Sequence, residues 1–166
     1  HTSEEQLQTL FDLGSKRNSF GIQDYDPIVQ KAIHRVQSFE QVKKVHDLSK
    51  KIGYESISHD LIFGLPFQTE ESIRNTIKNT IALKPDRIAY YSYAHVPWIK
   101  GVGQRGFEDN DLPKDSEKRH LYELGKQLFF DNGYVEIGMD HFALPSDSLH
   151  KAMEAKKLHR NFMGYT

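Results

Sequence analysis

The feature that most constrains the fold is an alternation of short apolar segments with longer segments whose apolar residues recur at helical spacing. Four short segments have the length and composition of β-strands: residues 19–23, 56–63, 87–93 and 135–139. Strands that alternate with helices imply a parallel sheet with right-handed crossover connections. The alternation therefore predicts an α/β fold, and it leaves open whether the sheet is doubly wound or part of a barrel.

Capping residues predict where the intervening helices begin and end. Helices are expected over residues 3–13, 26–33, 38–52, 69–84, 116–132 and 145–158. Four of them have expected N-terminal caps, at Asp26, Ser38, Thr69 and Ser116. Three of these helices are followed by a terminating glycine, at Gly14, Gly53 and Gly133. The histidines of the predicted helices are expected on exposed faces, namely His34, His46, His120 and His150.

Composition excludes several classes of function. The 166 residues carry a formal net charge of -1 and contain no cysteine. This near-neutral charge gives no sign of a nucleic-acid partner or an anionic membrane surface. The longest apolar runs are strand-sized and too short to span a bilayer. Without cysteine, the chain forms no disulfide, thiolate metal site or cysteine-held iron–sulfur cluster.

The two ends of the chain suggest that it is an internal piece of a longer protein. His1 stands where an initiator methionine would stand, and residues 161–166 do not form a polar ending. The polar N-terminus shows no secretory signal, so we expect a cytoplasmic protein.

Polar side chains mark the points where the predicted strands end, and in a parallel barrel these ends share one mouth. The carboxylate of Asp60 lies within an apolar run and needs a hydrogen-bond partner. It either bonds a neighbouring loop or accepts from a ligand hydroxyl such as that of a ribose. Gln23 has the same two interpretations, as a ligand contact or a loop cap. Arg35, after the short second helix, is either a solvated helix-end cation or a fork for a carboxylate.

Two histidines at strand ends, His95 and His141, are site candidates by position alone. No pair of histidines has the tight spacing typical of a metal site, so we expect no metal ligands. The connection over residues 96–115 exceeds the usual length of a βα loop, and loops of that length are often functional.

Five segments, taken together and in order, resemble the oxygen-independent coproporphyrinogen III oxidases of the radical S-adenosylmethionine family. They are residues 19–25, 60–69, 93–97, 138–143 and 159–165. The first two motifs are shared with haem-chaperone relatives. Those relatives usually have Ser where this chain has Asp24, and they lack the segments at 93–97 and 138–143. The resemblance therefore favours the oxidases.

The resemblance implies both a fold and a reaction. Residues 1–166 would form one partial domain, the second half of an open parallel (β/α)6 barrel of the radical S-adenosylmethionine type. In the whole enzyme, a [4Fe-4S] cluster reductively cleaves S-adenosylmethionine, and the resulting deoxyadenosyl radical takes hydrogen from a propionate side chain. Repeated on two propionates, this converts coproporphyrinogen III to protoporphyrinogen IX in haem biosynthesis. The three-cysteine cluster loop is absent here and is expected upstream.

The resemblance also implies four cofactor-binding residues, Gln23, Arg35, Asp60 and Ala94, which would hold the second molecule of a two-molecule S-adenosylmethionine site. It assigns no catalytic residue. Asn18 stands where the family usually has an apolar residue, so the first strand is expected to begin late or fit loosely.

Two alternatives stay open: a relative that binds and transfers haem, and an unrelated barrel with convergent strand ends. The family is often monomeric, whereas this segment alone is expected to be inactive and to self-associate.

Overall fold

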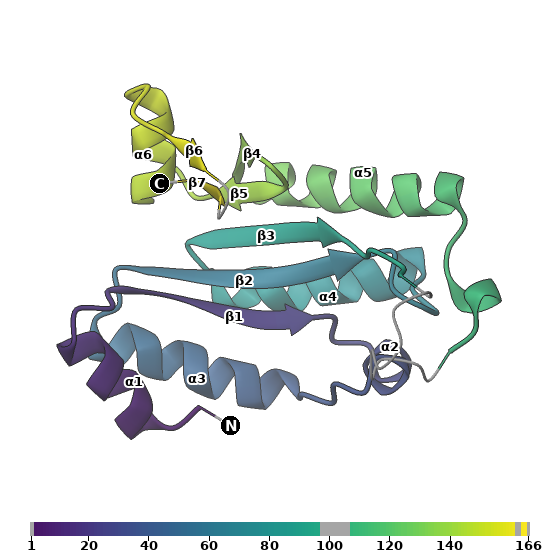
Figure 1. Ribbon diagram of the computed structural model, residues 1–166, viewed down its shortest axis with the longest axis horizontal. Coiled ribbons are helices and arrows are strands. Elements are labelled where there is room, and N and C mark those ends of the chain that lie inside the picture. The colour runs from purple at the N-terminus through teal and green to yellow at the C-terminus, as the bar shows by residue number, and fades with distance from the viewer. Residues whose placement is uncertain (1, 97–106, 162–163, 166) are drawn as a thin grey trace.

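The computed structural model describes residues 2–96, 107–161 and 164–165, and it contains a five-stranded sheet in the order β1-β2-β3-β5-β4 (Figure 1). The first three strands are parallel neighbours: β1 Arg17–Gln23, β2 Ser56–Phe63 and β3 Arg87–Ser92. A separate two-stranded ladder joins β6 Arg160–Asn161 to β7 Gly164–Tyr165. The predicted α/β class and the bounds of β2 are confirmed.

The helices are α1 Glu4–Asp12, α2 Pro27–Ala32, α3 Phe39–Ile52, α4 Glu70–Leu83, α5 Asp115–Asp131 and α6 Ser148–Glu154, with a 3-10 turn η1 at Asp109–Asp111. The predicted caps Asp26, Ser38 and Thr69 each accept a backbone N–H, and Ser3, for which no cap was predicted, does the same for α1. The prediction for Ser116 was wrong, because α5 begins at Asp115 and the Glu117 carboxylate accepts from the Lys114 N–H. Glu117 is the third residue of the helix, and its bond to the N-cap N–H is the half of a capping box that an acidic residue at this position makes.

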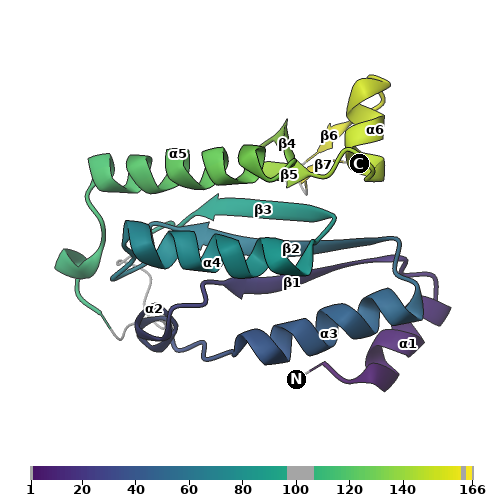
Figure 2. The same cartoon turned by 180° about the vertical axis from the view of Figure 1, so that it is seen from behind.

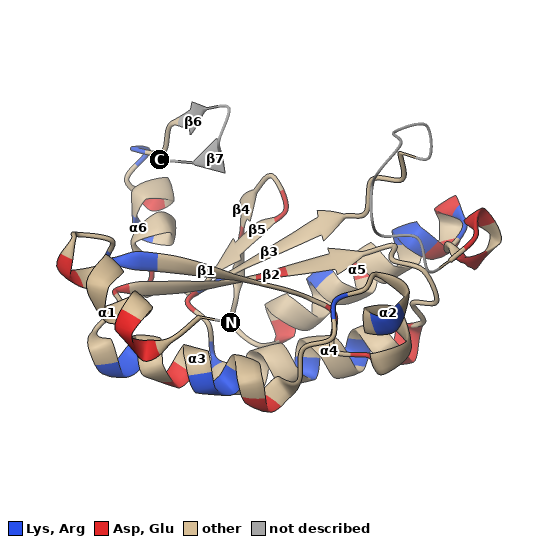
Figure 3. Ribbon diagram, turned by 60° about the horizontal axis from the view of Figure 1, so that its bottom comes forward, with Lys and Arg blue, Asp and Glu red and all other residues tan. Residues whose placement is uncertain are grey.

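Helices cover one face of the sheet, as the view from behind shows for α3 and α4 (Figure 2). The strand β2 alternates accordingly: Ile57 and Leu61 are fully buried beneath the helices, whereas Ser58 and Asp60 point to the other side. Among the described residues, no helix covers that other side over the carboxyl halves of β1 to β3 (Figure 3). We call it the open face, and its residues include Ser19, Gly21, Ser58, Asp60, Tyr91 and His141.

The far edge of the sheet departs from the predicted alternation. A turn with three positive φ angles, at Gly138, Met139 and Asp140, sends the chain back after β4 Val135–Gly138. The return strand β5 His141–Ala143 pairs antiparallel with both β3 and β4. A three-residue strand carries too little pattern to be recognised in the sequence. The sheet is therefore mixed at this edge, and His141 faces Ala89 of β3.

A buried polar layer lies between the sheet and α3. The prediction that His46 is exposed was wrong: it is 1% exposed, and its Nδ1 lies 3.0 Å from Nε2 of His59. His46 shares a helix face with Val42 and Ser49, and this face packs against the sheet. The expectation for Asn18 was also wrong, because β1 begins one residue earlier and the Asn18 amide donates to Ser49 Oγ at 2.8 Å.

The amino-terminal ends of the strands are closed by α6 and the residue before it. Asp147 accepts from Arg87 Nε at 2.8 Å and from Ser56 Oγ at 2.6 Å, and it also caps α6 through the Leu149 N–H. The apolar side of α6 packs on the sheet through Leu149, against Ile137 and other apolar residues. We call Ser56, Arg87 and Asp147 the amino-end lock. No helix in the described part of the chain has the length and apolar character needed to cross a membrane.

Candidate functional site

Two predicted site residues, Gln23 and Arg35, meet over the backbone of Gly21. A bulge between Gly21 and Gln23 turns the end of β1, and Gln23 has a φ of 69°. Arg35 donates from Nη2 to the Gly21 carbonyl at 2.6 Å. A Cβ at position 21 would lie 2.7 Å from Gln23 Nε2 and 2.9 Å from Arg35 Nη2. Glycine is required here because its missing side chain leaves the space that these two polar groups use.

Arg35 reaches this place because the chain turns sharply after α2. The helix ends at Ala32, His34 adopts a φ of 54°, and the Arg35 N–H bonds back to the Gln30 carbonyl at 2.9 Å. The guanidinium therefore lies on the end of β1. Arg35 is exposed, so its guanidinium stays in contact with solvent while it bonds the end of β1, and both interpretations of this residue remain open.

Asp60 lies beside this pair, because it faces Gly21 in the β1–β2 register. Ser19 Oγ donates to Asp60 Oδ1 at 2.7 Å, whereas Oδ2 accepts no hydrogen bond from the described residues. The carboxylate is bonded by a neighbouring strand and keeps one oxygen on the open face. We call Gln23, Arg35 and Asp60 the strand-end cluster. A hollow of about 340 Å³ lies beside Asp60 and extends along the open face toward the amino ends of the strands. Its lining includes Arg17, Ser56, Ser58, Asp60, Arg87, Tyr91 and His141.

The cluster is anchored from behind by Asp24, which is 0% exposed. Its carboxylate accepts from Gln68 Nε2 at 2.6 Å, Thr76 Oγ1 at 2.8 Å and the Asp26 N–H at 2.6 Å. Burial raises the pKa of Asp24, and these hydrogen bonds act against that rise. Asp24 therefore ties the end of β1 to the loop after β2 and to α4. The sequence placed Asp24 at a strand end, but its anchoring role depends on partners more than 40 positions away in the sequence.

The fourth predicted residue, Ala94, lies apart from the cluster. It follows β3 by two residues on the same carboxyl edge and is exposed. The preceding residue is held on both sides: the Tyr93 N–H donates to the Phe63 carbonyl at 2.8 Å, and Lys118 Nζ donates to the Tyr93 carbonyl at 2.7 Å. The structure thus brings Gln23, Arg35 and Asp60 together on β1 and β2. Ala94 lies beyond the end of β3, on the other side of β2 from β1.

The two histidine candidates have different surroundings. His141 lies on the open face, where Nδ1 is 2.7 Å from the Met139 carbonyl and Nε2 is 3.2 Å from the Tyr91 hydroxyl. A carbonyl only accepts, so in the neutral ring Nδ1 donates and Nε2 accepts from Tyr91. His95 instead contacts Asp109 at 2.9 Å, on the connection before α5. Residues 97–106, which include Pro97 and make up half of the 96–115 connection, lie outside the described residues, as do positions 162, 163 and 166.

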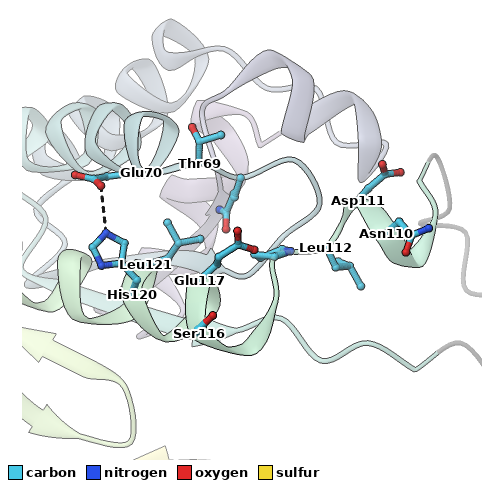
Figure 4. Close-up of a pocket in the computed structure, with 11 residues that line it drawn as sticks. Thr69, Glu70, Asn110, Asp111, Leu112, Ser116, Glu117, His120 and Leu121 are labelled. Atoms are coloured by element: carbon cyan, nitrogen blue, oxygen red, sulfur yellow. Dashed lines mark hydrogen bonds and ion pairs between the residues drawn. The ribbon is translucent and has the colours of Figure 1, made fainter.

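A wider hollow of about 540 Å³ lies elsewhere, between the starts of α4 and α5 (Figure 4). Its lining includes Thr69, Glu70, Asp111 and Glu117, and His120 Nε2 lies 3.1 Å from Glu70. No three His, Asp or Glu side chains in the described ranges converge as a metal site. None of the predicted site residues lines this hollow, so the open face remains the candidate site.

The groups on the open face suit a ligand that joins a carboxylate to a nucleoside. Arg35 can pair with a carboxylate, and Asp60 Oδ2 can accept from ribose hydroxyls. The Gln23 amide both donates and accepts, and the exposed backbone at Ala94 offers a further donor. S-adenosylmethionine has these complementary groups. An iron–sulfur cluster does not fit this segment, because it has no thiolate to offer.

Comparison with known proteins supports this chemistry. Residues 1–79 match the Radical SAM superfamily. The chain is 45% identical to an oxygen-independent coproporphyrinogen III oxidase of Helicobacter pylori, over 100% of this chain and 36% of the relative. It is 44% identical to the anaerobic coproporphyrinogen III oxidase 1 of Cereibacter sphaeroides, over 98% of this chain and 36% of the relative. The chain thus spans about a third of the length of the curated relatives it matches.

Solved structures agree. The structure of coproporphyrinogen III oxidase from Escherichia coli, described as a radical SAM enzyme, matches with a TM-score of 0.93 and 39% identity, over 100% of this chain and 38% of that one. A radical S-adenosylmethionine methyltransferase, TsrM of Kitasatospora setae, matches over 58% of this chain and 18% of its own, with a TM-score of 0.54. At 18% identity, that likeness shows the fold alone. The prediction of a partial, open α/β barrel is confirmed.

Proposed function

We infer from these matches that the chain belongs with the oxygen-independent coproporphyrinogen III oxidases of the radical SAM superfamily, as one segment of their length. We propose that the whole protein converts coproporphyrinogen III to protoporphyrinogen IX. Two propionate side chains would each lose one hydrogen atom, one electron and carbon dioxide, leaving vinyl groups. For each propionate, the hydrogen atom and the electron balance the cleavage of one S-adenosylmethionine to methionine and deoxyadenosine. S-adenosylmethionine, when bound beside an iron–sulfur cluster, supplies the radical chemistry for this reaction.

The observation that carries the proposal is the convergence of Gln23, Arg35 and Asp60 around Gly21 on the open face. In the proposed site, Arg35 pairs with the methionyl carboxylate and Asp60 Oδ2 accepts from the ribose. Gln23 hydrogen-bonds the same molecule, and Ala94 contributes its backbone. These residues bind and orient, and no residue of this segment is proposed as catalytic.

The ligands of the iron–sulfur cluster belong to another part of the protein, since this segment has no cysteine. We propose that residues 1–166 form one partial domain and that the whole enzyme works in the cytoplasm. Alone, the segment should neither bind a cluster nor turn over substrate. It should also self-associate, because β1 pairs with β2 on one side only and forms an edge of the sheet.

The direct test uses the full-length enzyme and measures S-adenosylmethionine binding by anaerobic equilibrium dialysis. Asp60→Ala and Gln23→Ala should each weaken binding, Asp60→Ala by about 30-fold or more, since a charged hydrogen-bond partner is lost. Ser19→Ala is the matched control, because it removes only the donor to Asp60 Oδ1. Its affinity should stay within about threefold. Unchanged binding in both Asp60→Ala and Gln23→Ala would remove the site assignment.

The reaction and the role of the segment need separate tests. The full-length enzyme should form protoporphyrinogen under anaerobic conditions. Stoichiometric haem binding without that product would instead favour a haem-transfer protein. Anaerobic reconstitution of the isolated 166-residue chain with iron and sulfide should give no cluster absorbance. A stoichiometric cluster on this chain would contradict the proposed division of roles.

A further inference from the structure

The side chain of Lys118 extends from α5 to the end of β3, where it contacts a backbone carbonyl. Its ammonium donates to the Tyr93 carbonyl at 2.7 Å. Its aliphatic stem lies directly over Gly64, which has a φ of +81°. A Cβ at Gly64 would come within 2.5 Å of Lys118 Cε, so the glycine both permits the turn and makes room for the lysine.

The carbonyl that Lys118 binds belongs to the same planar peptide group as the Ala94 N–H. A hydrogen bond from a cation is stronger than one from a neutral donor. It also polarises the amide, so that the N–H at the other end becomes a better donor. Ala94 is exposed on the carboxyl edge, and its N–H donates to no acceptor among the residues the structure describes. Lys118 thus strengthens a donor that is available to a ligand.

Tyr93 and His95, the neighbours of Ala94 in the sequence, are also held in place. The Tyr93 N–H is fixed to the Phe63 carbonyl, and the His95 ring contacts Asp109 at 2.9 Å. The rings of Tyr93, His95 and Phe107 lie 6.1 to 6.2 Å apart. Ala94 is therefore the exposed residue between two anchored neighbours. The ammonium of Lys118 is the group that supplies charge directly to its peptide.

We propose that Lys118 is a positioning residue for nucleoside binding. It holds and polarises the Tyr93–Ala94 peptide so that the Ala94 N–H donates to an acceptor nitrogen of a purine base. This inference rests on the proposed S-adenosylmethionine site and deepens it. It assigns a role to a side chain on α5, far in sequence from the strand-end cluster.

The test compares three variants of the full-length enzyme. Lys118→Met keeps the stem over Gly64 and removes the donor, whereas Lys118→Arg keeps a cationic donor. The control is Lys126→Met on the same helix. Lys126 Nζ lies 2.6 Å from Glu136 Oε2, and this ion pair is away from the carboxyl ends of the strands. Equilibrium dialysis gives the S-adenosylmethionine affinity, and steady-state assays give the KM for S-adenosylmethionine and kcat separately.

Lys118→Met should bind S-adenosylmethionine about tenfold more weakly, with KM raised and kcat within about twofold, because the lost interaction serves binding. Lys118→Arg should stay within about threefold of the parent, and Lys126→Met should not differ from it. Parent-like affinity in Lys118→Met, beside lost binding in Asp60→Ala, would overturn this inference and leave the proposed function standing. Equal impairment of Lys118→Arg and Lys118→Met would overturn it as well. Normal binding in both Asp60→Ala and Gln23→Ala would instead remove the underlying site.

Discussion

The two ends of the parallel strands differ in how completely their polar groups are paired. At the amino end, the lock of Ser56, Arg87 and Asp147 is satisfied internally and covered by α6. At the carboxyl end, Asp60 Oδ2 and the Ala94 N–H bond to none of the described residues. The same strands thus carry a closed end that stabilises the fold and an open end that keeps its hydrogen-bonding capacity for a ligand. This division is typical of barrels, whose chemistry lies at the carboxyl end of the strands.

The largest effect is expected at the closed end. Asp147→Ala removes a carboxylate that is 1% exposed and leaves Arg87, whose side chain is 15% exposed, without its partner. Loss of one member of a buried pair typically costs about 3–5 kcal/mol of unfolding free energy. Urea unfolding of the full-length protein measures it, and the folded variant should keep its S-adenosylmethionine affinity.

The matched control for this prediction is Asp47→Ala, which breaks the solvent-exposed ion pair with Lys43 on α3. It should leave the unfolding midpoint almost unchanged, because exposed pairs are screened by water. If Asp147→Ala were as mild as Asp47→Ala, or if it abolished ligand binding in folded protein, the two ends would not divide their roles as described.

A second prediction extends the comparison to the helix-covered face behind Asp60. Burial lowers the pKa of His46 to about 4 and that of His59 to about 3. The proximity of Lys50 lowers both further, and the His46 ring adds to the lowering at His59. Both rings are therefore neutral in the folded protein. Below pH 6.5 the unfolded chain binds protons that the folded chain does not, so stability is retained above pH 6.5 and falls as the pH drops toward 4. The slope is up to about 1.4 kcal/mol per pH unit for each ring.

Urea unfolding between pH 7.5 and 5 checks this dependence. His46→Gln should flatten the slope, because one of the two titrating rings is gone. His34→Asn is the control, since His34 is exposed and forms no ion pair with the described residues, and the slope should stay as it is. Equal stability of the parent protein at pH 7.5 and 5 would contradict this account, because it would mean that folding does not change proton binding by His46 and His59.

The smallest effect is expected at the open end, where Gly21→Ala places a methyl group against Gln23 and Arg35. Both contacts are with the ends of flexible side chains, so unfolding free energy should fall by less than about 1 kcal/mol. S-adenosylmethionine affinity should fall about tenfold, because both ligand contacts are displaced. Equilibrium dialysis measures the affinity, and urea unfolding measures the unfolding free energy. Ser58→Ala on the same face should change neither, and a stability loss in Gly21→Ala without an affinity loss would contradict the comparison.

Local signals predicted much of the fold. The bounds of β2 and the caps at Asp26, Ser38 and Thr69 followed from side-chain period and hydrogen-bonding chemistry, which act within a few residues. Long-range features were missed. The burial of His46 depends on a partner in β2, the lock at Asp147 joins three distant elements, and β5 is too short to carry a pattern.

The candidate site divides in the same way. Polar residues at strand ends were visible in the sequence, and the resemblance to a known family selected Gln23, Arg35, Asp60 and Ala94 among them. Their role in binding stays a prediction. Geometry adds what a single sequence does not carry: the sharp turn that returns Arg35 to β1, and the need for a glycine between Arg35 and Gln23. The contribution of Lys118 had no local signal either, because it depends on how α5 packs against the end of β3.

The most direct test of the account is amide hydrogen exchange of the full-length enzyme with and without S-adenosylmethionine, read by mass spectrometry. The ligand should protect peptides at the carboxyl ends of the strands, over residues 20–36 and 90–96. Peptides that contain the amino-end lock, over residues 145–155, should exchange at the same rate in both samples. Protection confined to residues 145–155, or absent from both 20–36 and 90–96, would contradict the claim that the open end of the sheet holds the ligand.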